Sequence, residues 1–188
     1  MSKELVSSID IAAPAERVWE VLVDFAAFPA WNPFIKQAEG RLEVGSRLTL
    51  RMQPVGGSAV ALRPTLVEVV DPQRLRWQGR LGVPGLFDAD HLFTVEPLGA
   101  AASRLVQQEH FSGLLVPFFR GSLDRGTLPA FQAMNAALKD RAERATAARG
   151  RLFGPTRHES TGLAERCRGR GENPPSESGG LPSGGDRT

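Results

Sequence analysis

Between Phe34 and Gly113 the sequence is a succession of extended segments, and this feature constrains the fold more than any other. Turn signals rich in Gly and Pro separate the segments, at Val44-Gly45, Gly56-Gly57, Asp71-Pro72, Pro84-Gly85 and Leu98-Gly99. The strands predicted between them are Ile35–Glu39, Ser46–Gln53, Val60–Val70, Arg74–Leu81, Leu86–Pro97 and Ser103–Ser112. No segment of helix length interrupts these strands, so the pattern predicts an antiparallel meander and disfavours a parallel sheet.

A further strand and a helix are predicted ahead of this run. The strand is Leu5–Ile11, and the amphipathic helix Ala15–Phe25 follows it, with apolar residues on one face at Val18, Leu22 and Phe25. Pro29 and Pro33 then leave room for one more short helix at most.

A long helix is predicted at the end of the run. The residues of its buried face recur every three or four positions, at Leu128, Phe131, Met134, Asn135, Leu138 and Ala142. Gly126 and Pro129 are expected to break or kink its start, with a preceding turn of helix at Pro117–Leu123. The order of elements places the chain in the α+β class.

The two strands around Leu98–Ala102 separate into a polar and an apolar face when alternate residues are compared. The apolar face is expected to point inward, and it holds Phe87, Ala89, His91, Phe93, Val95, Leu105, Gln107, Glu109 and Phe111. Three members of this inward face are polar, namely His91, Gln107 and Glu109.

The position of the hairpin turn decides which of these side chains meet. If the turn centres near Ala100, His91 lies opposite Glu109 and Phe93 lies opposite Gln107. A carboxylate buried without a partner is costly. Either His91 and Glu109 satisfy each other as a structural pair, or this face lines a cavity that is open to water or ligand. In the second case the two residues are polar anchors for a ligand in an apolar pocket. They are also the candidate catalytic residues, because a carboxylate can orient a histidine for proton transfer.

Large inward side chains complete the set of candidate ligand-binding residues. An aromatic residue or a methionine in such a sheet can form a cavity wall or simply fill the core. The candidates are Trp31, Trp77, His91, Phe93, Gln107, Glu109, Phe111, Phe131 and Met134.

The charge of the chain is concentrated at its C-terminal end. Residues 149–188 hold seven arginines against five acidic residues, and this excess accounts for the whole net charge of +2. Residues 1–148 have no net charge, with sixteen charges of each sign, so they lack the positive electrostatic potential that attracts nucleic acid. Residues 149–188 are rich in Gly, Pro and Arg and are expected to be a disordered tail after a single domain at residues 1–148.

Composition also limits the chemistry and the location. Cys167 is the only cysteine, and the three histidines form no metal-ligand pattern, so no metal and no cofactor are predicted. The longest apolar run, Leu114–Phe119, is far too short to cross a bilayer, and no stable membrane insertion is expected. Glu4 and Asp10 interrupt the start of the chain where a signal peptide is apolar, so we expect a cytoplasmic protein.

Several short sequence segments resemble those of one protein superfamily. They are Ile9–Asp24, Phe28–Phe34, Leu75–Gly79, His91–Glu96, Glu109–Leu115 and Phe131–Lys139. Together they resemble the START-like proteins, also called SRPBCC, which include polyketide cyclases and dehydrases, lipid-transfer proteins and the birch-pollen allergen group. The resemblance covers about residues 3–147, and none of the segments is a catalytic motif.

The resemblance implies a helix-grip fold, in which a curved antiparallel sheet of six or seven strands wraps the long C-terminal helix, with two short helices after the first strand. It also implies a cavity between sheet and helix. The function it favours is binding or carriage of a hydrophobic or amphipathic small molecule. The alternatives are a cyclase or dehydratase that uses the same cavity without a cofactor, and a protein-interaction module such as a chaperone regulator. Whether the chain is an enzyme stays open at this point.

Overall fold

The structure is a computed structural model that describes residues 1–153. The elements follow in the order β1 (Ser2–Ile11), α1 (Ala15–Val23), η1 (Phe25–Ala27), α2 (Phe28–Trp31), β2 (Ile35–Glu39), β3 (Thr49–Met52), β4 (Val60–Leu62), β5 (Thr65–Val70), β6 (Arg74–Arg80), β7 (Asp88–Gly99), β8 (Ala102–Ser112), α3 (Val116–Ser122), η2 (Leu123–Thr127) and α4 (Leu128–Phe153). Helix α4 continues past residue 148, where the change in composition places the domain boundary, and the rest of the predicted tail lies outside the described residues.

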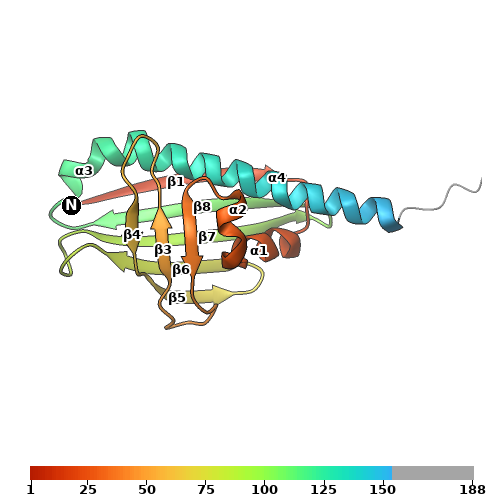
Figure 1. The fold of residues 1–188 in the computed structure, drawn as a ribbon, viewed down its shortest axis with the longest axis horizontal. Helices are drawn as coiled ribbons and strands as arrows, with labels where there is room; N and C mark the ends of the chain where they lie inside the picture. The colour runs from red at the N-terminus through yellow and green to blue at the C-terminus, as the bar shows by residue number, and fades with distance from the viewer. Residues whose placement is uncertain (154–188) are drawn as a thin grey trace, which may run out of the picture. The chain divides into compact units, whose positions relative to one another are not determined.

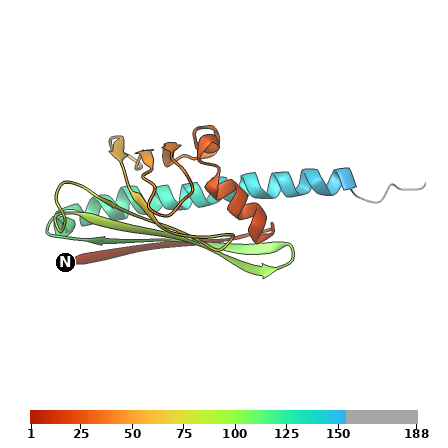
Figure 2. The same cartoon turned by 90° about the horizontal axis from the view of Figure 1, so that it is seen from below.

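The strands form two antiparallel sheets that meet along one seam. The larger sheet has the order β1-β8-β7-β6-β5, and the smaller one has the order β2-β3-β4. A bridge between Arg47 and Thr65 joins them, and the Leu66 amide donates to the Ser46 carbonyl at 2.9 Å. Figure 2 shows α4 along one face of the larger sheet, with α1, α2 and the smaller sheet on the same side. The α+β class and the helix-grip arrangement are confirmed (Figure 1).

One predicted strand is wrong in its extent. The segment Val60–Val70 forms two strands, β4 and β5, which belong to different sheets. The break falls at Arg63 and Pro64, and Pro64 has no amide hydrogen to continue a ladder. Its carbonyl accepts a hydrogen bond from the Leu48 amide at 2.9 Å instead. This division raises the number of described strands to eight.

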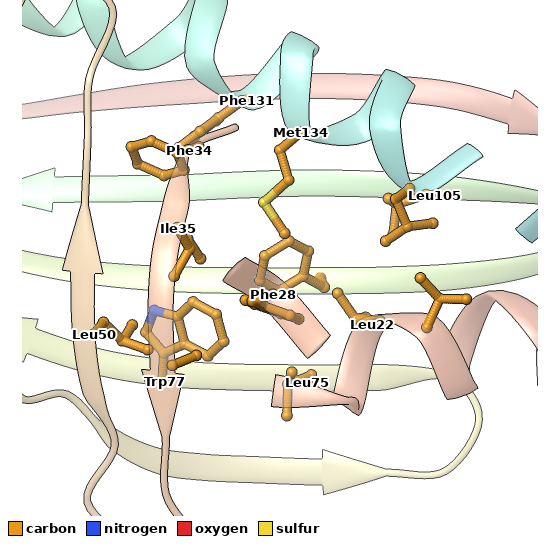
Figure 3. Close-up of a cluster of buried hydrophobic side chains, with 14 of the residues drawn as sticks. Leu22, Phe28, Phe34, Ile35, Leu50, Leu75, Trp77, Leu105, Phe131 and Met134 are labelled. Carbon is orange, nitrogen blue, oxygen red and sulfur yellow. The ribbon is translucent and has the colours of Figure 1, made fainter. Parts of the chain in front are cut away.

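The core lies between the inner face of the larger sheet and α4 (Figure 3). Phe131, Met134 and Leu138 on α4 are fully buried, and Figure 3 shows Phe131 and Met134 among side chains from β2, β6 and β8. Burying a side chain of this size contributes about 1.5–3 kcal/mol, so this face of α4 is a main source of stability. Each predicted member of the helix face that repeats every three or four residues is buried, except the half-buried Leu128.

The predicted interruption before the long helix is a π-helical turn. Helix α3 runs into η2, and η2 runs directly into α4, whose second residue is Pro129. Gly126 in η2 lies against the turn between β3 and β4, because the Val55 amide donates to its carbonyl at 3.2 Å. A Cβ atom at Gly126 would lie 3.2 Å from the Val55 carbonyl oxygen. This close approach brings the turn between β3 and β4 against η2 at one end of the fold.

Candidate functional site

A cavity of about 490 Å³ lies at that end of the fold. Its walls come from the β3–β4 hairpin, from the connection between β6 and β7, from the inner ends of β7 and β8, and from α3 and η2. The residues that line it are Phe34, Met52, Pro54, Val55, Gly56, Gly57, Ser58, Val60, Leu62, Gly79, Arg80, Leu81, Phe87, Ala89, Glu109, Phe111, Phe119, Ser122, Leu123, Arg125, Gly126 and Thr127.

The cavity wall is mainly apolar from its base to its mouth. Phe87, Phe111 and Leu123 are buried lining residues, whereas Val55 and Phe119 also line the cavity but are 56% and 44% exposed. The exposed lining residues show that the cavity opens to solvent between the loops. More than half of the exposed large apolar side chains among the described residues belong to the segments around this mouth, and those are Val55, Leu81, Val83, Leu114, Phe118 and Phe119.

The base of the cavity is shaped by a local turn. The Asn32 side-chain oxygen accepts hydrogen bonds from the amides of Phe34 and Ile35, at 2.9 and 2.8 Å. An asparagine that bonds the backbone two and three residues ahead fixes a tight turn. This turn holds Phe34 between the cavity and the core, with its ring 5.5 Å from the ring of Phe131.

Glu109 on β8 is the one buried carboxylate in the lining. The register of the hairpin places it opposite His91 on β7, and Phe93 opposite Gln107, so the predicted register is confirmed. The Glu109 residue is 7% exposed. Its Oε1 lies 3.4 Å from His91 Nδ1, which is within ion-pair distance and longer than an ordinary hydrogen bond.

His91 lies on the core side of Glu109, away from the cavity, and is closely packed. The Gln107 side-chain amide lies 3.1 Å from His91 Nε2 and forms a hydrogen bond with it, while His91 Nδ1 is on the side of Glu109. The centroids of the Trp77, Phe93 and Phe131 rings lie 5.0, 4.5 and 5.1 Å from that of His91. The three polar residues of the inward face therefore form a row, Gln107 to His91 to Glu109, that runs from the core to the cavity.

The predicted ligand-binding residues fall into three groups. Glu109 and Phe111 line the cavity. Six others form one buried cluster behind it, namely Trp77, His91, Phe93, Gln107, Phe131 and Met134. Trp31 is half-buried and packs on Phe28, with a ring-centroid distance of 5.2 Å.

The location of the cavity differs from the expectation. It lies beside η2, just before the start of α4, whereas the resemblance implies a cavity between the sheet and the long C-terminal helix. Beneath α4, the fully buried side chains of Phe131, Met134 and Leu138 occupy that space.

Much of the lining was not among the predicted site residues. Phe87 could have been identified from the sequence, because the alternation along its strand places it on the same inward face as His91 and Phe93. Pro54, Leu123 and Thr127 could not, since they come from a strand turn and a helix start that meet only in the folded chain.

Two features are absent from the described part of the chain. Among residues 1–147, no three His, Cys, Asp or Glu side chains gather in a way that could hold a metal ion. No helix described in the structure combines the length and the apolar character needed to cross a membrane.

Known structures share this fold at low sequence identity. An aromatase/cyclase from Streptomyces sp. R1128 is 20% identical, with a TM-score of 0.66 over 80% of this chain and 99% of that one. Norcoclaurine synthase from Thalictrum flavum is 16% identical, with a TM-score of 0.63 over 78% and 97%. A START superfamily protein from Mycobacterium smegmatis is 21% identical, with a TM-score of 0.60 over 76% and 98%. No curated protein matched the sequence.

The match to a family model covers all the strands and most of the described helices. The family described as polyketide cyclase / dehydrase and lipid transport matches residues 2–143, from the first strand to well inside the long helix. This match includes every strand and every residue of the cavity wall. The chain therefore belongs to the polyketide cyclase, dehydrase and lipid-transport family.

Proposed function

We propose that the protein binds and carries a hydrophobic or amphipathic small molecule in the cavity beside η2. The observation that carries this proposal is an apolar cavity of about 490 Å³ that opens to solvent. Pockets for small molecules typically measure about 300–1,000 Å³ and are lined by apolar side chains with a few polar groups. The cavity has that size and that lining.

The exposed apolar residues at the mouth support the same function. Val55, Leu81 and Phe119 line the cavity and also meet solvent. Exposed apolar side chains that gather around an opening favour contact with an apolar molecule. They would lower the cost of moving such a molecule from water into the cavity.

Dye binding with a matched pair of variants tests the proposal. Ala89 on β7 lines the cavity, whereas Ala61 on β4 is exposed, between two lining residues that face the other way. We expect the full chain to bind the neutral dye N-phenyl-1-naphthylamine. Ala89→Phe should weaken binding at least about tenfold by filling the cavity, and Ala61→Phe should leave it unchanged. No dye binding, or equal binding by Ala89→Phe and wild type, would contradict the proposal.

A second candidate function is proton-transfer catalysis on the bound molecule, as in a cyclisation or a dehydration. The observation that favours it is the Glu109 carboxylate in the cavity wall, with its Oε1 3.4 Å from His91 Nδ1. A carboxylate in an apolar site can act as a general base.

Deuterium exchange distinguishes the catalyst from the carrier. An enzyme of this kind would remove a proton next to a carbonyl group, so it should speed exchange of the methyl protons of acetophenone in heavy water, followed by proton NMR. Glu109→Gln should return the rate to background. Exchange at the background rate with wild-type protein would leave the binding function and exclude this catalytic one.

A further inference from the structure

Glu109 presents its carboxylate to the cavity and has few partners in the protein. It is 7% exposed, yet no described residue donates a hydrogen bond to either of its oxygens. The His91 nitrogen at 3.4 Å is its one charged or titratable neighbour within ion-pair distance among the described residues. Buried carboxylates ordinarily accept several hydrogen bonds, because desolvating them without such bonds is costly. The Glu109 oxygens are not among the fully buried atoms that lack a partner, so they face the cavity, where water or a bound ligand can donate to them.

The residue behind Glu109 is closely packed. His91 is enclosed by three aromatic rings and forms a hydrogen bond with Gln107 through its far nitrogen. The ring is closely packed, and its Nδ1 lies 3.4 Å from one oxygen of Glu109. The carboxylate itself lines the cavity.

The cations of the cavity lie elsewhere in its wall. Arg80 and Arg125 are lining residues, but both are exposed, and neither comes within ion-pair distance of Glu109. The polar lining therefore has two unlike parts, a buried acceptor and an exposed pair of cations. A ligand whose positive or hydrogen-bond-donating group enters first can pair that group with the Glu109 carboxylate. A ligand whose carboxylate enters first would place it against the Glu109 carboxylate, which is unfavourable.

We infer that the bound molecule carries a hydrogen-bond donor head, an ammonium or a hydroxyl group, that contacts Glu109 while its apolar body fills the cavity. This inference rests on the proposed binding function. Glu109 is then a specificity residue, with His91 as its neighbour on the core side. Because a hydrogen bond to a charged group is stronger than one between neutral groups, the head group contributes selectivity beyond that of the apolar wall.

Three probes of equal chain length test the inference on the full protein, namely decylamine, decanol and decanoate. Isothermal titration calorimetry should show that decylamine or decanol binds at least about tenfold more tightly than decanoate. This comparison uses the wild-type protein alone and so does not depend on the folding of any variant. The tighter of the two donor probes identifies the head group as ammonium or hydroxyl.

Two variants locate the selectivity. Glu109→Gln should remove the preference for the donor head, while Glu96→Gln, an exposed carboxylate on the neighbouring strand, should retain it. Decanoate binding as tightly as both donor probes, or an unchanged preference in Glu109→Gln, would overturn the inference and leave the binding function standing. Failure of all three probes to bind would overturn both.

Discussion

Gln107 forms a hydrogen bond with His91 across the β7–β8 ladder, and His91 in turn lies beside Glu109. The Gln107 Nε2 and His91 Nε2 atoms lie 3.1 Å apart, and both residues are almost wholly buried. If the Gln107 amide group donates, His91 Nε2 accepts and the ring proton is on Nδ1, the nitrogen that lies 3.4 Å from Glu109.

Gln107→Leu should break this row of polar residues. The substitution leaves His91 Nε2 buried without a donor, which should lower the free energy of unfolding by about 1–3 kcal/mol. Nitrogen NMR of His91 should also show the proton moving from Nδ1 toward Nε2. Gln108→Leu, on the outward face of the same strand, is the matched control and should change neither quantity. An unaltered His91 spectrum in Gln107→Leu would contradict the assignment of the ring proton.

Phe131→Ala should be strongly destabilising. Phe131 is fully buried beneath α4, and removing such a ring typically costs about 3–5 kcal/mol because a void remains. Phe118 is 83% exposed, so Phe118→Ala should change stability by less than about 0.5 kcal/mol. Urea denaturation measures both. A similar loss for the two variants would mean that the space under α4 is not the core.

Gly113 should tolerate no side chain. Its φ angle is +126°, and a Cβ atom would lie 2.5 Å from the Leu86 carbonyl oxygen. Gly85 also has a positive φ, of +80°, but a Cβ there would have no neighbour within 4 Å. Thermal unfolding should therefore show a clearly larger loss for Gly113→Ala than for Gly85→Ala, because only the former adds a backbone clash to the conformational cost. Equal losses would rule out the close approach at Gly113.

Acid should weaken the contact between α4 and the end of β1. The Glu143 carboxylate accepts a hydrogen bond from the Ala12 amide at 2.7 Å, and this bond, aided by Lys139, lowers the pKa of Glu143 from its ordinary value. A lowered pKa in the folded state stabilises the protein above the unfolded-state pKa, and that stabilisation is lost as the pH falls through the folded-state pKa.

The free energy of unfolding as a function of pH measures this effect. Glu143→Gln should be less stable than wild type near neutral pH, and the difference should shrink as acid protonates Glu143 in the wild type. Glu16→Gln, a substitution at an exposed carboxylate in α1, should follow the wild-type curve. A constant difference between wild type and Glu143→Gln at all pH values would show that the carboxylate charge does not contribute.

The hairpin and its polar row were predictable because alternation along a strand is set by geometry. His91, Gln107 and Glu109 share one parity, and a turn near Ala100 fixes their partners. The helix face of α4 was predictable for the same reason, since its period of three to four residues reflects the helical repeat.

The cavity was not predictable, because it depends on volume and on long-range contact. Nothing local in the sequence says that Phe131 and Met134 fill the space beneath α4, or that Gly126 brings a distant strand turn against η2. The division of the segment 60–70 at Pro64 belongs to the same class, since a proline marks a break but not the sheet that each half joins.

Intermolecular nuclear Overhauser effects between bound N-phenyl-1-naphthylamine and protein methyl groups test the central claim most directly. Val60, Leu62 and Leu123 line the cavity, whereas Leu75 and Leu105 are buried in the core behind it. The dye protons should show effects to the first three residues and none to the other two. Effects confined to exposed residues of the outer strand faces, such as Val6 and Val67, would contradict a ligand-binding cavity.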